Sequence, residues 1–325
     1  MRFAKGHGTE NDFVILLDPD DSSGLTADLT ARLCDRRAGI GADGVLRAVR
    51  AAACRIAGPT DGAPGPAGGA GEPEWFMDYR NADGSVAEMC GNGIRVFARY
   101  LVRHGLAAGP DFTVATRSGP RLIRMCADGG VAVDMGAVAV LGPGSAVIAG
   151  QAYPGLRVSV GNPHLACLVA GPLAAFDLSR PPRLDPGQFP EGGNVELVQA
   201  TGPASVAMRV HERGSGETRS CGTGAVAAVA AAASATGSGD GAWAVRVPGG
   251  DLTVTLEAGR AWLTGPAVIV AEGDLDPSWL TAPDADEARN PATREAGAAD
   301  GTFTPAAPGP AHLHDRGRSV GLSPR

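Results

Sequence analysis

The hydrophobic pattern predicts short strands interrupted by three helices. Residues 13–17 (FVILL) form a continuous apolar run typical of a buried strand, and residues 27–34 fit a short helix. Apolar residues three and four positions apart predict a second helix over 91–104, which Gly105 ends. Residues 222–236 are almost all Ala and Val, so we expect a third helix that is enclosed by sheet.

Strand-like runs separated by turn residues fill most of the remaining chain. Gly, Pro, Asn or Asp stands between most of them, as in a strand-rich α+β protein. A turn is expected at 81–85 (NADGS). The predicted strands cover residues 75–79, 112–116, 121–125, 131–135, 156–160, 164–169, 194–199, 205–210, 243–247, 252–256 and 267–271.

Two segments have a different composition. Residues 57–73 (AGPTDGAPGPAGGAGEP) lack periodicity and are rich in turn formers, which predicts a mobile surface insertion. Residues 276–325 are rich in Ala, Pro and Asp with little apolar content, which predicts a disordered tail that the chemistry does not need.

Length and charge narrow the possible classes of protein. The 325 residues suffice for two domains of ordinary size. A formal net charge of −7 argues against nucleic acid or an anionic membrane as a partner. The chain opens without a secretory leader pattern and contains no apolar run of about 20 residues, so we expect a cytoplasmic protein.

The six cysteines do not fit a disulfide framework or a zinc site. None belongs to a C-x-x-C pair, and a long chain without a leader gives no reason to expect disulfides. Most of them are expected to be inert core residues. No role follows from the surroundings of Cys34, Cys54, Cys126 and Cys167.

The other two cysteines lie in segments that echo each other. Cys90 and Cys221 each begin a Cys-Gly-x-Gly sequence that opens a predicted helix. A polar residue, Asn81 or Glu212, stands nine positions before each cysteine. A duplicated domain produces such a pattern, because each copy brings one polar loop and one helix start to a shared cleft.

This placement suits the inversion of a stereocentre. Amide groups at a helix start favour the thiolate form of a cysteine. Inversion needs a base on one face of a carbon and an acid on the other, and Cys90 and Cys221 provide such a pair. Residues 91–92 and 222–223 would surround a carboxylate with backbone amides. No dinucleotide fingerprint or other cofactor motif is evident, so we expect neither cofactor nor metal.

Eight ordered motifs make the chain resemble diaminopimelate epimerases. Any one motif is weak, but their combined order and spacing are specific. They are GHGTENDF (6–13), GIGADG (39–44), NADGS (81–85), MCGNGIR (89–95), GNPH (161–164), HERGSGET (211–218), SCGTGA (220–225) and PGG (248–250).

The resemblance implies an α+β fold of two pseudo-symmetric mixed α/β domains, each a sheet around a central helix, with the active site in the cleft between them. It places residues 1–119 and 266–275 in the N-terminal domain and residues 120–265 in the C-terminal domain. The implied reaction is the conversion of LL-2,6-diaminopimelate to the meso form, for lysine and peptidoglycan precursors. The family often forms homodimers, so we expect one here.

The resemblance also assigns roles to residues. Cys90 and Cys221 match the catalytic thiols, and His164 and Glu212 match groups that tune their pKa. Glu212 and Arg213 match the pair that holds the distal amino-acid end, where an Arg fork can bind a carboxylate. The residues matched to substrate binding are Asn11, Asn81, Gly91, Asn92, Asn162, Asn194, Glu212, Arg213, Gly222 and Thr223.

Taken singly, these residues have ordinary explanations. Asparagines commonly form turns, Arg213 could be a solvated charge, and His164 could be a satisfied core histidine. The paired context favours the functional interpretation. One departure concerns Gly44, which stands where many members have a side chain that contacts substrate, often Gln.

Other functions stay open at the level of sequence. Proline racemases and hydroxyproline epimerases also use two cysteines, but their substrates lack a distal amino-acid head. The phenazine-pathway isomerase type lacks the cysteine pair. A redox-switch protein would join Cys90 and Cys221 in a reversible disulfide. A ligand-binding module without catalysis would leave both thiols unexplained.

Overall fold

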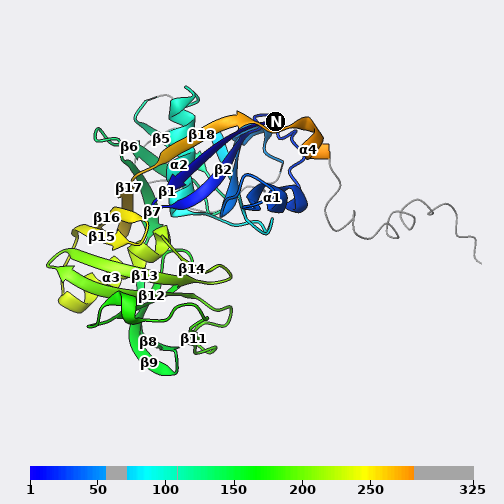
Figure 1. The fold of residues 1–325 in the computed structure, drawn as a ribbon. Coiled ribbons are helices and arrows are strands. Elements are labelled where there is room, and N and C mark those ends of the chain that lie inside the picture. Colours follow the sequence, from blue (N-terminus) through cyan, green and yellow to red (C-terminus); the bar gives the residue numbers. More distant parts are fainter. Residues whose placement is uncertain (56–71, 108, 282–325) are drawn as a thin grey trace, which may run out of the picture. The chain divides into compact units, whose positions relative to one another are not determined.

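The computed structural model describes residues 1–55, 72–107 and 109–281, shown as a coloured ribbon in Figure 1. Within this part of the chain, strands dominate and helices are few. The fold is of the α+β class, as the sequence predicts.

The N-terminal part forms a run of strands that we call the first repeat, β1 to β7. Its elements are β1 (Arg2–Gly8), β2 (Asn11–Leu17), α1 (Ala27–Cys34), β3 (Gly44–Arg50), η1 (Ala51–Ala53), β4 (Trp75–Asn81), α2 (Gly91–Arg103), β5 (Asp111–Ala115), β6 (Arg121–Met125) and β7 (Val131–Ala137).

After the connecting strand β8 (Ala139–Ile148) comes the second repeat, β9 to β17. Its elements are β9 (Gln151–Ser159), β10 (Pro163–Leu168), η2 (Leu173–Ala175), β11 (Arg183–Leu184), β12 (Asn194–Gly202), β13 (Ser205–Glu212), β14 (Gly216–Thr218), α3 (Gly222–Thr236), β15 (Gly241–Val247), β16 (Gly250–Glu257) and β17 (Arg260–Gly265). The chain continues into β18 (Val268–Asp274) and α4 (Pro277–Thr281).

Strand pairing repeats in the same order in both parts. β1–β2 is antiparallel, β2–β3 parallel, β3–β4 antiparallel and β4–β5 parallel. β9–β10, β10–β12, β12–β13 and β13–β15 follow the same alternation. A parallel pair needs a long crossover, and α2 and α3 supply the equivalent crossovers before β5 and β15. The order of strand pairing is therefore repeated in the two parts of the chain, as expected from the duplication that the two cysteine motifs predict.

Each crossover helix is packed against the strands of its own repeat. α2 contacts β1, β2 and β7, and α3 contacts β9, β10, β12 and β13. Residues 225–233 of α3 are all buried, which requires the small Ala and Val side chains that the sequence has there. Gly105 and Gly237, both at φ 65°, follow the two helices in the left-handed conformation that ends a helix.

The two repeats join through paired strands. β7 pairs with β17, and β18 returns to pair antiparallel with β1. Strand pairing runs from β5 through β6 to β7 without a break at residue 119. The division into domains at 119/120 and 265/266 therefore stays a prediction.

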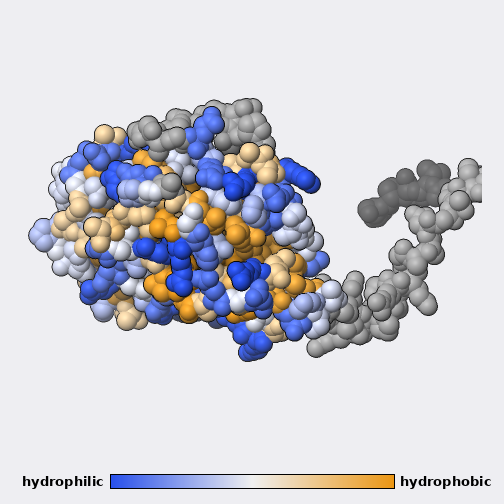
Figure 2. Space-filling model, turned by 90° about the horizontal axis from the view of Figure 1, so that it is seen from above, coloured by the Kyte–Doolittle hydropathy of each residue, from blue (hydrophilic) through white to orange (hydrophobic). Residues whose placement is uncertain are grey.

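The molecular surface mixes polar and apolar patches. On the face shown in Figure 2, hydrophilic areas in blue lie between smaller apolar areas in orange. Val270 on β18 is the most exposed of the large hydrophobic side chains, at 62%. Among the residues that the structure describes, no helix is both long and apolar enough to cross a lipid bilayer.

The predicted helices are confirmed, with α1 at 27–34, α2 at 91–103 and α3 at 222–236. Each predicted strand overlaps an observed one. The sequence analysis missed β1, β3, β8 and β17, and the short strands β11 and β14.

The predicted tail begins too early. Residues 277–281 form α4, and the side chains of Trp279 and Leu280 pack against a core cluster that contains Leu16 and Leu33. The correction has a physical reason, because Trp279 and Leu280 are two adjacent large apolar residues in a segment that otherwise has little apolar content. Residues 282–325, and residues 57–71 of the predicted insertion, lie outside the described part of the chain.

Candidate active site

The two cysteines hold the same position at the start of their helices. Cys90 is the N-cap of α2, and its sulfur accepts a hydrogen bond from the backbone amide of Gly93 at 3.3 Å. Cys221 is the N-cap of α3, and its sulfur accepts from Gly224 at 3.4 Å. Their backbone angles also agree (φ −135°, ψ 119° and φ −125°, ψ 118°). The sequence duplication is thus a duplication of local geometry.

At both sulfurs, burial and the backbone amides of the helix start shift the thiol pKa in opposite directions. Burial raises the pKa of Cys90 to about 11, although the amides of Gly93 and Asn92 lower it. Burial also raises the pKa of Cys221 well above its usual value, and here Thr223 and Gly224 act in the opposite direction. The expectation that the amides favour thiolate has the correct sign, but desolvation is the larger effect. Both cysteines are free thiols, as are the other four.

Two side chains lie close to both sulfurs. The carboxylate of Glu212 adds to the burial effect by raising the pKa of Cys90 and of Cys221, and it lies within hydrogen-bonding reach of Cys221. Burial raises the pKa of Tyr79, and negative charge on Cys90, Glu212 and Cys221 raises it further. Both thiols therefore belong to one small region.

The helix starts that carry the thiols touch each other. A Cβ on Gly222 would lie 2.9 Å from the Cα of Gly91, so a side chain at that position would push the two helices apart. The side-chain amide of Asn92 donates to the carbonyl of Ser220 at 2.9 Å across the same contact. Because each cysteine immediately precedes one of these glycines, the close approach brings the sulfurs to a common volume.

Matched asparagines accompany the thiols. The Oδ1 atom of Asn11 lies 3.6 Å from the sulfur of Cys90 and accepts from the side chain of Asn92 at 3.2 Å. In the second repeat, Asn162 donates to the hydroxyl of Thr223 at 3.4 Å, and this hydroxyl lies 3.5 Å from the sulfur of Cys221. Asn11 in the first repeat and Asn162 in the second therefore have equivalent places beside the two thiols.

The second repeat also contains a buried histidine and glutamate in contact. His164 and Glu196 are both 0% exposed, and Nδ1 of His164 lies 2.7 Å from Oε1 of Glu196, within hydrogen-bonding distance. Nε2 of the same ring lies 3.0 Å from Oδ1 of Asn162. A continuous set of contacts thus joins Glu196 through His164, Asn162 and Thr223 to the thiol.

The residues assigned to the distal end of the substrate form a second group. Oδ1 of Asn194 accepts from the backbone amide of Arg213 at 2.9 Å, whereas the guanidinium of Arg213 is half-exposed and pairs with Glu191 at 3.7 Å. Asn81 accepts from the hydroxyl of Tyr79 at 2.8 Å. The structure connects Asn194 with Arg213 but leaves the guanidinium at the surface.

Three residues near the site were missed by the sequence analysis. Glu196 stands in an otherwise apolar strand (NVELV), and a carboxylate at such a position indicates a buried partner. Tyr79 could be found only from the strand register. Arg95 is 0% exposed and donates to the carbonyl of Gly91 at 3.0 Å.

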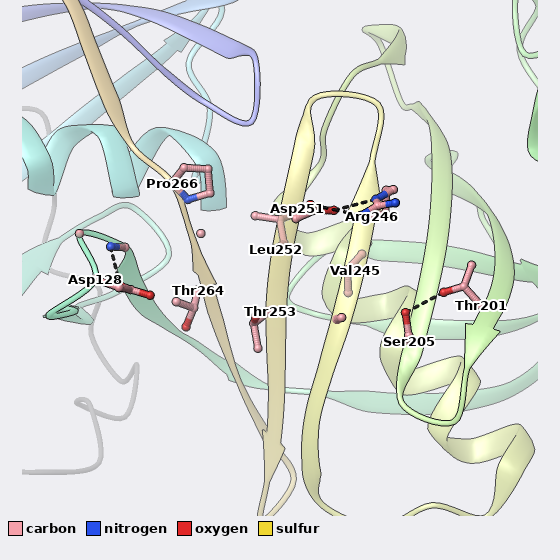
Figure 3. Close-up of a pocket in the computed structure, with 14 residues that line it drawn as sticks. Asp128, Thr201, Ser205, Val245, Arg246, Asp251, Leu252, Thr253, Thr264 and Pro266 are labelled. Carbon is pink, nitrogen blue, oxygen red and sulfur yellow. Dashed lines mark hydrogen bonds and ion pairs between the residues drawn. The ribbon is translucent and has the colours of Figure 1, made fainter.

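A separate cavity of about 780 Å³ is lined by residues of β15, β16 and β17, of the β6–β7 turn and of the β12–β13 hairpin (Figure 3). The Arg246–Asp251 ion pair, at 2.9 Å, and the Thr201–Ser205 hydroxyl pair lie along it. None of the predicted site residues lines this cavity. Within the described ranges, no group of three or more His, Cys, Asp or Glu side chains is placed to hold a metal ion.

Comparison with known protein families shows which family the chain belongs to. The family model for diaminopimelate epimerase matches residues 3–141 and 156–270, most of the chain. The chain belongs to the diaminopimelate epimerase family. This confirms the resemblance that the eight motifs indicate.

Similar members of the diaminopimelate epimerase family match over almost their whole length. The diaminopimelate epimerase of Thermobifida fusca is 60% identical over 275 residues, which are 85% of this chain and 98% of that protein. The diaminopimelate epimerase of Mycolicibacterium smegmatis is 52% identical over 288 residues, 86% of this chain and 98% of that protein.

Solved structures with low identity share the fold of this diaminopimelate epimerase family member. A probable proline racemase from Agrobacterium radiobacter has a TM-score of 0.57 at 14% identity and covers 88% of this chain and 97% of its own. A phenazine biosynthesis protein from Bacillus anthracis has a TM-score of 0.56 at 16% identity, with 85% and 99% covered. The rival families considered from sequence thus have the same architecture.

Proposed function

We propose that this protein converts LL-2,6-diaminopimelate to meso-2,6-diaminopimelate without a cofactor, in the synthesis of lysine and peptidoglycan precursors. The observation that carries the proposal is the pair of N-cap thiols at touching helix starts, with Glu212 close to both. Family membership supports the substrate, and the paired thiols support the reaction type.

In the proposed reaction, one thiolate removes the α-proton and becomes a thiol. The electron pair stays on the α-carbon and its carboxylate. The thiol on the opposite face then donates its proton to that carbon and becomes the thiolate, so one proton is taken and one is returned. In the reverse direction Cys90 and Cys221 exchange roles.

Because the pKa values of both thiols are raised, the substrate itself contributes to the formation of the thiolate. Without a ligand, burial keeps Cys90 and Cys221 protonated near neutral pH. A bound α-ammonium group is a nearby positive charge, which favours the thiolate. We therefore propose that substrate binding itself creates the base.

Backbone amides would hold the α-carboxylate. Gly91, Asn92, Gly222 and Thr223 begin the two helices, where free N–H groups and the helix dipoles favour negative charge. The same groups would stabilise the charge that develops when the proton leaves. Asn11 and Asn162 then fix the side chains around this volume.

The distal amino-acid end would lie among Asn81, Asn194, Glu212 and Arg213. We propose that the guanidinium of Arg213 leaves Glu191 and binds the distal carboxylate, since its present ion pair is exposed and weak. Glu212 would act mainly on the thiols, and His164 would tune Cys221 through Asn162 and Thr223.

A cytoplasmic location and a homodimer belong to the same proposal. Both agree with a biosynthetic enzyme of this family, and light scattering on the purified protein would measure the oligomeric state.

Replacement of either thiol tests the proposal. Cys90→Ser and Cys221→Ser should each reduce turnover of LL-diaminopimelate by at least about 100-fold, the lower range for loss of an acid or base. Both variants should stay folded by circular dichroism. Cys126→Ser, outside the site, is the matched control and should have wild-type turnover. Near-normal turnover by either site variant, or no turnover by the reduced wild-type protein, would contradict the proposal.

A further inference from the structure

Gly44 and Asn194 hold equivalent positions in the two repeats. In the parallel pair β2–β3, Phe13 lies opposite Gly44, and in β10–β12, His164 lies opposite Asn194. Gly44 is also paired with Asn81. Val195 is paired with His211, so the preceding residue Asn194 lies beside Glu212. The first repeat therefore lacks the amide side chain that the second repeat has at this position.

Tyr79 occupies the volume that a side chain at position 44 would need. A Cβ on Gly44 would lie 2.8 Å from Cε2 of Tyr79 and 2.5 Å from the carbonyl oxygen of Arg80. In the second repeat the residue two positions before Glu212 is Val210, which is much smaller than tyrosine and leaves room for Asn194. The first repeat thus combines the small Gly44 with the large Tyr79, whereas the second repeat combines the larger Asn194 with the smaller Val210.

The hydroxyl of Tyr79 is placed among the site residues. It donates to Oδ1 of Asn81 at 2.8 Å, and the Nδ2 group of Asn81 donates to Ser85 at 3.0 Å. The edge of the ring packs against Phe13, with centroids 6.0 Å apart. Burial, with the charges of the two thiols and Glu212, raises the pKa of Tyr79, so it is a neutral phenol near pH 7.

A phenol that donates its proton to Asn81 keeps two lone pairs on oxygen. Those lone pairs can accept hydrogen bonds from a cation, and a substrate with a second amino-acid head brings an ammonium group to this end of the site. The carboxylate of Glu212, whose charge acts on Tyr79, attracts the same cation.

We propose that Tyr79 is a substrate-binding residue that accepts a hydrogen bond from the distal ammonium group of the substrate, in the place that a side chain at position 44 would otherwise fill. The proposal rests on the proposed function, because only a two-headed substrate has this group. It deepens that function by giving Tyr79 a part in selecting diaminopimelate over one-headed amino acids.

The test compares diaminopimelate with L-2-aminopimelate, which lacks only the distal amino group. In Tyr79→Phe, the KM for LL-diaminopimelate should rise about tenfold with kcat within about twofold, as for loss of one hydrogen bond to a charged group. The Ki of L-2-aminopimelate as a competitive inhibitor should change by less than about twofold, because the lost contact is absent from that ligand. Tyr153→Phe, outside the site, is the matched control.

The outcomes separate the two proposals. An unchanged KM in an active Tyr79→Phe variant, or an equal rise of KM and Ki, would overturn the role of Tyr79 and leave it as a space-filling residue. An inactive wild-type protein would instead contradict the proposed function. The Phe variant keeps the ring against Phe13, and its melting temperature should match that of wild type.

Discussion

At the scale of single residues, the two thiols show how opposing effects set reactivity. Each sulfur accepts a backbone N–H bond at a helix start, which favours the thiolate. Each is also removed from water, and this desolvation is the larger effect. Burial thus keeps both thiols protonated near neutral pH in the free enzyme, and we propose that the site becomes reactive when a cation enters it.

The first prediction concerns the order in which the thiols react without substrate. Alkylation proceeds through the thiolate, so its rate should rise about tenfold per pH unit up to the pKa. For Cys90 the rise should continue to about pH 11. Cys221 should react more slowly at every pH below that, because burial raises its pKa as well and it is only 6% exposed, whereas Cys90 is partly exposed.

Iodoacetamide labelling followed by peptide mass spectrometry measures both rates in one sample. The partly exposed and buried cysteines elsewhere in the chain serve as internal references. A plateau for either thiol near pH 8, or faster labelling of Cys221, would show that burial does not control these groups.

At the scale of elements, the two repeats have the same order of strand pairing and the same helix starts, but different side chains lie beneath those helix starts. Under α2, a Cβ on Gly93 would lie 3.2 Å from Leu46 and 3.4 Å from Phe13. Under α3, the equivalent Gly224 would meet Oε1 of Glu196 at 2.8 Å. An apolar pair in one repeat is thus replaced by a hydrogen-bonded His–Glu pair in the other. The two thiols therefore have chemically different supports although their local geometry is the same.

This asymmetry predicts a selective effect of Glu196→Gln. Glu196 raises the pKa of Cys221, so removing its charge should lower that pKa and move Cys221 alkylation to lower pH. The alkylation profile of Cys90 should not move. Turnover should fall about tenfold, because His164 loses the partner that holds it against Asn162.

Leu46→Met, in the equivalent place under α2, is the matched control and should leave both alkylation profiles unchanged. Equal shifts at both thiols in Glu196→Gln would mean that the variant acts through general loosening of the fold.

The helices that the sequence predicted are those whose apolar residues form a simple pattern. α2 was predicted from apolar positions at helical spacing, and α3 from its run of mainly Ala and Val residues, which is continuously buried. β3 was missed because its sequence contains Arg47, which is 2% exposed and neutralised by Asp18, Asp21 and Asp78. Charge at a core position conceals a strand until its partners are known.

The same limit applies to the site. The cysteines and their glycines were evident because both copies of the motif are continuous in sequence. The link from Glu196 to Cys221 and the exchange of Tyr79 for a side chain at 44 depend on which strands are neighbours. Such relations depend on which residues lie opposite one another in neighbouring strands, and a single sequence does not give this register.

At the scale of the whole molecule, α4 extends the core beyond the predicted boundary. The guanidinium of Arg32 lies over the ring of Trp279 at 4.7 Å, and Nε1 of Trp279 donates to the carbonyl of Ala38 at 3.1 Å. The segment therefore attaches the end of β18 to α1.

Two truncations separate this attachment from the rest of the tail. Ending the chain at Thr281 should leave turnover and melting temperature unchanged, in line with the prediction that the chemistry does not need the tail. Ending it at Asp276 should lower the free energy of unfolding by about 2 kcal/mol, from loss of the partly buried Trp279 and its cation–π contact. Thermal unfolding of both truncated chains measures this, and equal stability would assign no anchoring role to α4.

A probable proline racemase and a phenazine biosynthesis protein, at 14% and 16% identity, share the fold of this chain. We propose that the touching helix starts provide the pair of opposed acid and base groups and that the surrounding loops select the substrate. In this account, the N-cap thiols carry the reaction, whereas Tyr79, Asn81, Asn194 and Arg213 select the substrate.

The most direct test follows the proton itself in deuterated water. A thiol carries a single proton, so the hydrogen removed by one cysteine cannot be the one that the other returns. At low conversion of LL-diaminopimelate, the meso product should contain one deuterium at the inverted carbon while the remaining substrate stays unlabelled. Product that keeps protium at that carbon, or substrate that gains deuterium as fast as product forms, would contradict two opposed thiols.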